Sequence, residues 1–344
     1  MSKKLSKKIY WLNLILSIMI VSYHAYNIPV YKNILTATNI GVIWIYMENY
    51  VSSIERVAVP LFFCMSGFLY YHNYTPDKAI YKIKSRIKSL LIPYFLWNFI
   101  SWLCYFFVTH IPFIASKINM TMDLSFKGIL YEICMGKYNA LWFVRVLFFL
   151  ALTSPIVFYL INRKNKALFF VSVLISLEII IGHSDTSFLF GACFYYIGAS
   201  LALNNTKMVI TDLKHPKICL IIFLVLEAVL ASSLSSFQPR KHFLFILMSV
   251  ILFWYGSDTF IALLPEKENA FWMTKYSFFI YCSHGFILES IEKILLIILG
   301  NTLIGAIVDY MAAPVLTVIC ICALAYFLKR NLKPIWVILN GGRV

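Results

Sequence analysis

The chain has 344 residues, of which 61% are hydrophobic and 13% are charged. A soluble domain carries about a quarter charged residues, so this composition excludes an ordinary soluble protein and indicates a polytopic membrane protein. The net charge of +15 does not indicate nucleic-acid binding, because the basic residues fall in short segments between apolar runs. The eight cysteines lie mostly inside those runs and form no Cys-x-x-Cys pair. They predict buried thiols and neither a metal site nor a disulfide framework.

Ten apolar runs are long enough to cross a bilayer. In chain order they cover roughly residues 10–27, 51–72, 90–110, 140–161, 167–182, 187–203, 217–234, 242–264, 276–299 and 304–328. No repeat, low-complexity tract or soluble domain interrupts them, so we expect one all-α transmembrane bundle over residues 1–344. The first run follows a basic segment without a small-residue cleavage site, which favours an uncleaved first helix over a signal peptide.

The distribution of lysine and arginine predicts the orientation of the bundle. With the N-terminus in the cytoplasm, the inside segments carry 21 basic residues and the outside segments carry 6. This is the positive-inside pattern, so we expect both termini and residues 73–89 inside, with residues 28–50 and 111–139 outside. The expected location is the plasma or inner membrane. The abundance of Lys, Ile, Asn and Tyr indicates a bacterial source.

The first apolar run carries a polar face. Asn13, Ser17 and His24 are spaced by four and seven residues, so they share one side of a helix. At 1.5 Å per residue His24 lies ~21 Å beyond Tyr10, or ~9 Å below the outer surface of a hydrocarbon core of ~30 Å. Because lipid cannot satisfy polar groups, this face should turn into the bundle.

Four further charged groups fall in the outer half of the predicted bundle. Glu55 and Arg56 begin the second run, Arg145 lies near the outer end of the fourth, and Glu178 lies on the fifth. Charges at such a depth are costly and usually functional. The alternative is that the arginines reach the outer head groups and that Glu55 is solvated.

Five segments spread over most of the chain carry a resemblance to a known family. They are SIMIVSYHAY (17–26), VPLFFCMSGFLYY (59–71), KIKSRIKSLLIPYFLW (82–97), NALWFVRVLFF (139–149) and FFIYCSHGFIL (278–288). With these segments the sequence resembles the membrane-bound acyltransferase-3 family, whose ten-helix-type members move acyl groups onto extracytoplasmic sugars and similar acceptors. One position departs from the pattern: Asn13 stands where the family usually has an arginine, and an asparagine supplies no charge.

The resemblance implies an O-acyltransferase that takes an acyl group, most simply acetyl, from a cytoplasmic acyl-CoA-type donor. The acceptor would be a hydroxyl of a glycan or a lipid-linked sugar outside. His24 is then expected to act as the general base. Glu178 or Glu55 would orient its imidazole, and Arg145 would polarise a carbonyl. Arg86 matches the family's loop arginine and is expected to hold the donor's phosphates. No metal cofactor is expected.

Two features have competing explanations. His284 is expected only ~12 Å from the inner surface, where it would line a donor path or bond across helices. Ser66 and Gly67 permit a close approach of helices, either for packing or for a substrate path. The competing function is a transporter that exports an acyl group or a glycan intermediate without catalysing transfer. The missing arginine at Asn13 favours that alternative.

Overall fold

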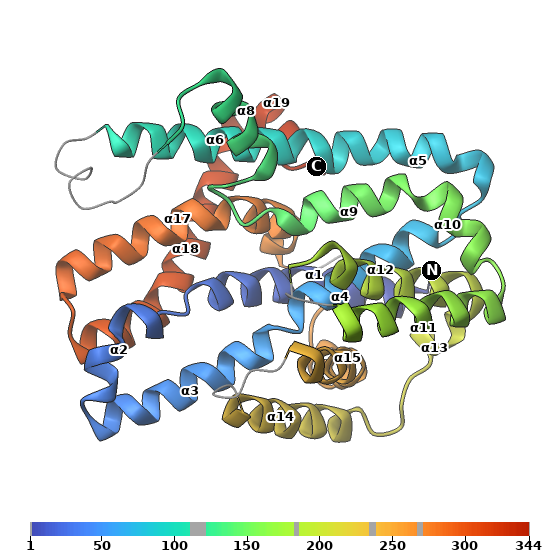
Figure 1. The fold of residues 1–344 in the computed structure, drawn as a ribbon, viewed down its shortest axis with the longest axis horizontal. Coiled ribbons are helices and arrows are strands. Elements are labelled where there is room, and N and C mark those ends of the chain that lie inside the picture. The colour runs from blue at the N-terminus through green and yellow to red at the C-terminus, as the bar shows by residue number, and fades with distance from the viewer. Residues whose placement is uncertain (1, 111–121, 182–185, 234–238, 267–270, 344) are drawn as a thin grey trace.

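The fold is seen in a computed structural model of the chain. It describes residues 2–110, 122–181, 186–233, 239–266 and 271–343. Within these ranges the regular structure is helical and no strand occurs. Most of the long helices run roughly in the same direction, whereas α15 is seen end-on between them (Figure 1). The predicted all-α architecture is therefore confirmed.

The helices are as follows in chain order: α1 (Lys3–His24), α2 (Ile28–Thr36), α3 (Asn39–Glu55), α4 (Ala58–Tyr71), η1 (Pro76–Lys78), α5 (Ala79–Arg86), η2 (Ile87–Leu91), α6 (Ile92–Thr109), α8 (Phe126–Met135), α9 (Trp142–Leu152), α10 (Ser154–Ile161), α11 (Lys164–Ile181), α12 (Phe188–Asn204), α13 (Thr206–Ile210), α14 (Pro216–Ser233), α15 (Pro239–Gly256), α16 (Asp258–Ile261), η5 (Trp272–Tyr276), α17 (Ser277–Leu299), α18 (Leu303–Asn331) and α19 (Lys333–Leu339). Of these, η1 and η5 are 3₁₀-helices and η2 is a π-helix.

Five helical stretches among the described residues are long and apolar enough to cross a membrane: Lys3–His24, Asn39–Tyr71, Pro76–Thr109, Phe243–Ile261 and Leu303–Asn331. A sixth candidate is α9 with α10, which bends by 69° where α10 begins with a proline in its first turn. These lengths and compositions make the protein a helical membrane bundle.

Several predicted span boundaries are wrong. Residues 28–50 and 73–89, expected as connections, are mostly helical: α2 and α3 occupy the first, and η1, α5 and the start of η2 occupy the second. A hydropathy run detects uniformly apolar helices, but helices with a polar face extend past its ends. Part of the expected outer segment 111–139 lies outside the described residues, and α8 occupies much of the remainder.

The tightest crossing in the bundle joins α4 and α12. A Cβ atom at Gly67 would stand 1.9 Å from the carbonyl oxygen of Tyr195, and one at Gly198 would stand 2.0 Å from that of Cys64. Only glycine lets two helix backbones approach this closely. Gly67 therefore serves the packing of these two helices. Ser66 lies next to it on α4 and is half-buried.

Candidate functional site

The seam between α1 and α17 brings two distant polar stretches together. The Ser17 hydroxyl donates to the Ser277 carbonyl oxygen across 3.1 Å. Seven residues further along each helix, the rings of His24 and His284 lie 5.1 Å apart between centroids. The equal offsets show that the two helices run parallel and in register here. We call His24 and His284 the histidine pair.

This juxtaposition corrects the predicted depth of His284. The sequence placed it much nearer the inner surface than His24, yet the two rings are neighbours. The error arises because α17 does not begin at a membrane surface. Its first residue, Ser277, lies beside Ser17, which is already four turns into α1. Counting from the start of an apolar run therefore misjudges depth.

The hydrogen bonding of His284 determines its tautomer. Its Nδ1 lies 2.6 Å from the carbonyl oxygen of Tyr281. A carbonyl can only accept, so Nδ1 carries the proton and Nε2 keeps a free lone pair. The side chain is 0% exposed, and Nε2 has no hydrogen-bond partner among the described residues. A buried unpaired acceptor costs ~1–3 kcal/mol, so this nitrogen is available for His24 or for a ligand.

His24 differs from its partner in accessibility. It is the last residue of α1, and its side chain is exposed while that of His284 is fully buried. The ring contacts His284 and also lies edge-on to Tyr23, with 5.8 Å between the ring centroids. The pair thus combines a reachable imidazole with a buried one whose tautomer is held by the backbone.

Two carboxylates lie close to the end of α1. Glu55 is buried at the end of α3 and lies against the Ser22 side chain, two residues before His24. Glu48 is fully buried and accepts hydrogen bonds from the backbone N–H groups of Asn27 (2.8 Å) and residue 28 (3.2 Å). It therefore caps the start of α2. Of the two carboxylates proposed to orient His24, Glu55 therefore lies beside the end of α1, whereas Glu178 lies on α11.

A buried polar cluster continues from Glu48 towards α18. Asn27 Nδ2 donates to the Ala306 carbonyl oxygen and to Asp309 Oδ2, both across 3.0 Å. The cluster also holds polar atoms that are buried and without a hydrogen-bond partner among the described residues: Asn27 Oδ1, Asp309 Oδ1 and the hydroxyls of Tyr31 and Tyr310. The Glu48 carboxylate also lies against the Trp44 side chain. We call Asn27, Tyr31, Glu48, Asp309 and Tyr310 the Glu48 cluster. Its spare acceptors and hydroxyls match a ligand rich in O–H groups.

Sequence reasoning missed the Glu48 cluster. Glu48 lies in the segment expected outside the bundle, and nothing in the local pattern shows that α3 buries it. The only available signal was Asp309, an acidic residue inside an apolar run.

Two other predicted site residues lie elsewhere. Glu178 is buried on α11, which packs against α10, α12 and α15, with Cys193 as an electrostatic neighbour. Arg145 donates to the Met135 carbonyl oxygen across 3.0 Å, at the end of α8. The structure therefore does not bring either side chain to His24, which lies where α1 meets α17. Asn13 is half-buried on α1, and its carbonyl oxygen accepts from Ser17.

The turn that leads into α9 also touches α17 beside the histidine pair. Asn139 Nδ2 donates to the Cys282 carbonyl oxygen across 3.2 Å, and the Tyr281 hydroxyl donates to the carbonyl oxygen of the next residue of that turn. Asn139 is buried and its Oδ1 has no hydrogen-bond partner among the described residues. The sequence marked this residue only as the start of a resembling segment. It holds the part of α17 that carries His284.

A basic face forms where α5 meets η2. The Arg86 guanidinium lies 5.4 Å from the centroid of the Tyr70 ring, and Lys82 lies 5.2 Å from the same ring. Within the described part of the chain, no ion pair is formed by either cation. Stacking on an aromatic ring fixes the position of a guanidinium without neutralising it. The predicted phosphate-binding residue is therefore available to an anion.

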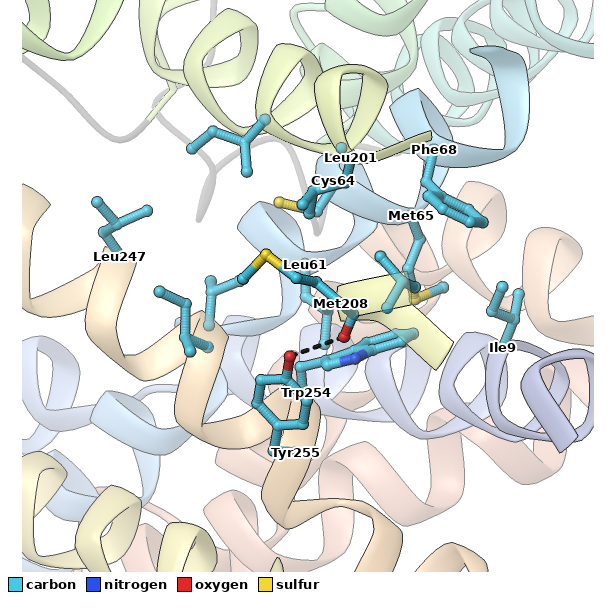
Figure 2. A pocket seen from close by; sticks show the side chains of 15 residues that line it. Ile9, Leu61, Cys64, Met65, Phe68, Leu201, Met208, Leu247, Trp254 and Tyr255 are labelled. Atoms are coloured by element: carbon cyan, nitrogen blue, oxygen red, sulfur yellow. Dashed lines mark hydrogen bonds between the residues drawn. The ribbon is translucent and has the colours of Figure 1, made fainter. Parts of the chain in front are cut away.

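A cavity of about 240 Å³ lies apart from these polar groups, between α4, α12, α13 and α15 (Figure 2). Its walls are hydrocarbon, sulfur and aromatic groups, with the Tyr255 hydroxyl donating to the Met208 carbonyl oxygen across 2.7 Å. No acid–base pair lines it. It is suited to an apolar chain and not to acyl-transfer chemistry.

Comparison with known proteins gives one match. A family model described as an acyltransferase domain matches residues 8–328, nearly the whole chain. No curated protein and no solved structure matches it. The match includes both members of the histidine pair, Arg86 and the Glu48 cluster. The chain therefore belongs to the acyltransferase-3 family and is a membrane acyltransferase.

Proposed function

We propose that this acyltransferase moves an acyl group, most simply acetyl, from a cytoplasmic acyl-CoA-type donor to a hydroxyl of an extracytoplasmic glycan or lipid-linked sugar. The observation that carries the proposal is the histidine pair. An accessible imidazole beside a buried, neutral imidazole with a free Nε2 is equipped for proton transfer from a hydroxyl. The proposal includes the predicted topology of ten spans with both termini inside, supported by the distribution of basic residues.

In the proposed reaction His24 is the general base. It accepts the proton of the acceptor hydroxyl as the oxygen attacks the thioester carbonyl, so that a C–O bond forms and the C–S bond breaks. The protonated imidazole then gives its proton to the leaving thiolate, which releases coenzyme A as a thiol and leaves an ester. His284 Nε2 accepts the N–H of His24 and keeps its other nitrogen basic. His284 thus takes the orienting role expected of a carboxylate.

The acceptor is proposed to lie against the Glu48 cluster. That cluster adjoins His24 through Asn27, three residues along the chain, and it offers buried acceptors and hydroxyls that lack partners in the described structure. A sugar presents several O–H groups that can satisfy both kinds of atom. The chemistry of the cluster therefore supports a polyhydroxylated acceptor over an apolar one.

The donor's phosphates are proposed to lie at Arg86. This cation is positioned by Tyr70, and no carboxylate pairs with it among the described residues.

The transporter alternative is favoured by Asn13, which leaves α1 without the family's usual guanidinium. An acyltransferase and an exporter would both bind ligands on two sides of the membrane. Only the formation of an ester product distinguishes the first from the second.

The test measures both chemistry and product. Inverted membrane vesicles containing the protein receive acetyl-CoA labelled in the acetyl group. Thiol release is followed together with the label in alkali-labile esters on surface glycan from matched cells. Transfer requires both signals, and His24→Gln should remove both at equal protein level. Label that crosses the membrane without forming ester would establish the transporter and reject the proposal.

A further inference from the structure

Residues 340–343 form a tight turn after α19 that returns the chain to the bundle. Gly341 and Gly342 have φ angles of +64° and +76°, a conformation that side chains disfavour. The Gly342 N–H donates to the Val337 carbonyl oxygen across 2.7 Å. The preceding helix is docked on α6, where Trp97 Nε1 donates to the Leu339 carbonyl oxygen across 3.1 Å. This turn gives Arg343 a defined position.

Arg343 lies over the junction of three elements. Its guanidinium stands 3.9 Å from the centroid of the Phe278 ring on α17. Nη1 donates to the carbonyl oxygens of Ser89 (3.3 Å) and Asn340 (3.1 Å). Ser89 belongs to η2, and π-helical turns are frequent at functional sites. Figure 1 shows the C-terminal end beside the junction of α5 and α6. The side chain remains exposed.

The position of Arg343 brings it close to Arg86. Its Nη1 bonds to the carbonyl oxygen of Ser89, which lies three residues, or about one helical turn, after Arg86 on the continuous stretch of α5 and η2. In the described residues neither arginine forms an ion pair with a carboxylate, although five other ion pairs are present. Two like charges held together by backbone bonds and aromatic rings are unfavourable unless an anion lies between them. Guanidiniums bind phosphate oxygens in a bidentate manner, so a phosphorylated ligand is the natural counter-charge.

We propose that Arg343 and Arg86 together form a two-guanidinium site for the diphosphate of the acyl donor. This inference rests on the proposed function and adds a residue that lies outside the region matched to the family. The site is connected to the chemistry through α17, because Arg343 stacks on Phe278 and His284 lies six residues further along that helix, a rise of ~9 Å. A pantetheine arm held at its phosphate end extends well beyond that distance.

The proposal is tested by ligand binding to the purified full-length protein. Coenzyme A, pantetheine and inorganic pyrophosphate are titrated against wild type, Arg343→Gln, Arg86→Gln and the double variant. Each single variant should bind coenzyme A ~10- to 100-fold more weakly, as expected for loss of a charge-assisted contact. The double variant should lose less than the product of the two effects, because both arginines hold one ligand. Pantetheine, which lacks the diphosphate, should bind all four proteins equally.

Two controls separate a binding role from a structural one. Arg330→Gln removes one positive charge from the exposed end of α18 and should leave coenzyme A affinity within twofold. Gly341→Ala places a Cβ atom 2.5 Å from the Ser89 carbonyl oxygen and from Arg343 Nη1, whereas Gly342→Ala meets nothing within 4 Å. Both share the strain of a positive φ. Only Gly341→Ala should reproduce the Arg343→Gln defect.

The outcomes distinguish this inference from the function on which it rests. If Arg86→Gln weakens coenzyme A binding and Arg343→Gln does not, the two-guanidinium site is rejected while the donor proposal survives. If the wild-type protein does not bind coenzyme A but binds pyrophosphate in a way that depends on Arg343, the anion site is supported and coenzyme A is rejected as the donor. If no phosphorylated probe depends on Arg343, the inference fails whichever donor is used.

Discussion

Two helix seams of the bundle, α4 with α12 and α1 with α17, differ in what their residues do. At the α4–α12 seam, Gly67 and Gly198 let backbone meet backbone and leave no room for another atom. At the α1–α17 seam, Ser17 donates a hydrogen bond to α17. Two turns further along, the rings of His24 and His284 face each other, and Nε2 of His284 has no hydrogen-bond partner among the described residues. Direct contact of backbone with backbone marks the first seam as structural, and an unsatisfied polar atom marks the second as functional.

A substitution that disrupts the first seam should prevent the protein from folding stably. In Gly67→Val the new Cβ atom would collide with the Tyr195 carbonyl oxygen, and backbone cannot move aside as a flexible side chain can. Overpacking of this kind costs ~1–3 kcal/mol or more, enough to deplete a marginally stable protein. We expect little folded protein in a detergent-resistance or thermal-unfolding assay. Ser66→Ala, one residue away, should behave as wild type. Normal stability of Gly67→Val would show that the seam is looser than the structure indicates.

A substitution of His24 in the second seam should abolish acyl transfer without changing the amount of folded protein in the membrane. His24→Gln keeps size and one hydrogen bond but cannot accept and release a proton, so transfer should fall by ~100-fold or more. Its membrane level should be unchanged, because one polar contact in a membrane bundle is worth only ~1 kcal/mol. Ester-linked acetyl on surface glycan, divided by the protein level, measures the effect. Near-normal acetylation would make His24 a packing residue.

The sequence was informative wherever composition or helix spacing determines the outcome. A 61% hydrophobic chain has to form a helical membrane bundle, because lipid leaves backbone groups no other partners. The shared face of Ser17 and His24 follows from helix geometry alone, and both side chains do line the seam with α17. The family resemblance, carried by five short segments, is confirmed over residues 8–328.

What could not be predicted depends on how helices are placed against each other. His284 was assigned the wrong relative depth because the register of α17 on α1 is a tertiary property. Glu48 lies in a segment that looked exposed, and only the start of α2 explains its burial. Arg343 is a single basic residue in its local sequence, and only the glycine turn brings it to Ser89, one turn after Arg86. Glu178 and Arg145 were expected in the same outer half of the bundle as His24 but lie on other helix pairs.

The role of His284 can be tested with two substitutions, each of which mimics one of its two ring nitrogens. His284→Asn retains a donor near the Nδ1 position for the Tyr281 carbonyl oxygen but deletes the free acceptor, whereas His284→Gln retains an acceptor near Nε2. If Nε2 orients His24, the asparagine variant should lose activity by ~10- to 100-fold and the glutamine variant by less. The pH dependence of kcat/KM should also change in the asparagine variant. The opposite ranking, with an unchanged pH profile, would make the bond to Tyr281 the important one.

The smallest expected effect compares the two buried carboxylates that were candidates to orient His24. Glu55 lies against Ser22 on the same helix as His24, whereas Glu178 packs among α11, α12 and α15. Glu55→Gln preserves shape and removes a carboxyl group beside the end of α1, so we expect a loss of about tenfold or less in transfer rate, in the range of a single hydrogen bond. Glu178→Gln should change the rate by less than twofold at equal protein level. Because both variants remove one buried carboxylate, a difference between their transfer rates shows the effect of where the carboxylate lies and not of removing a buried charge. Equal losses would mean that net charge in the bundle matters more than proximity to His24, and a larger loss at Glu178 would transfer the orienting role to α11.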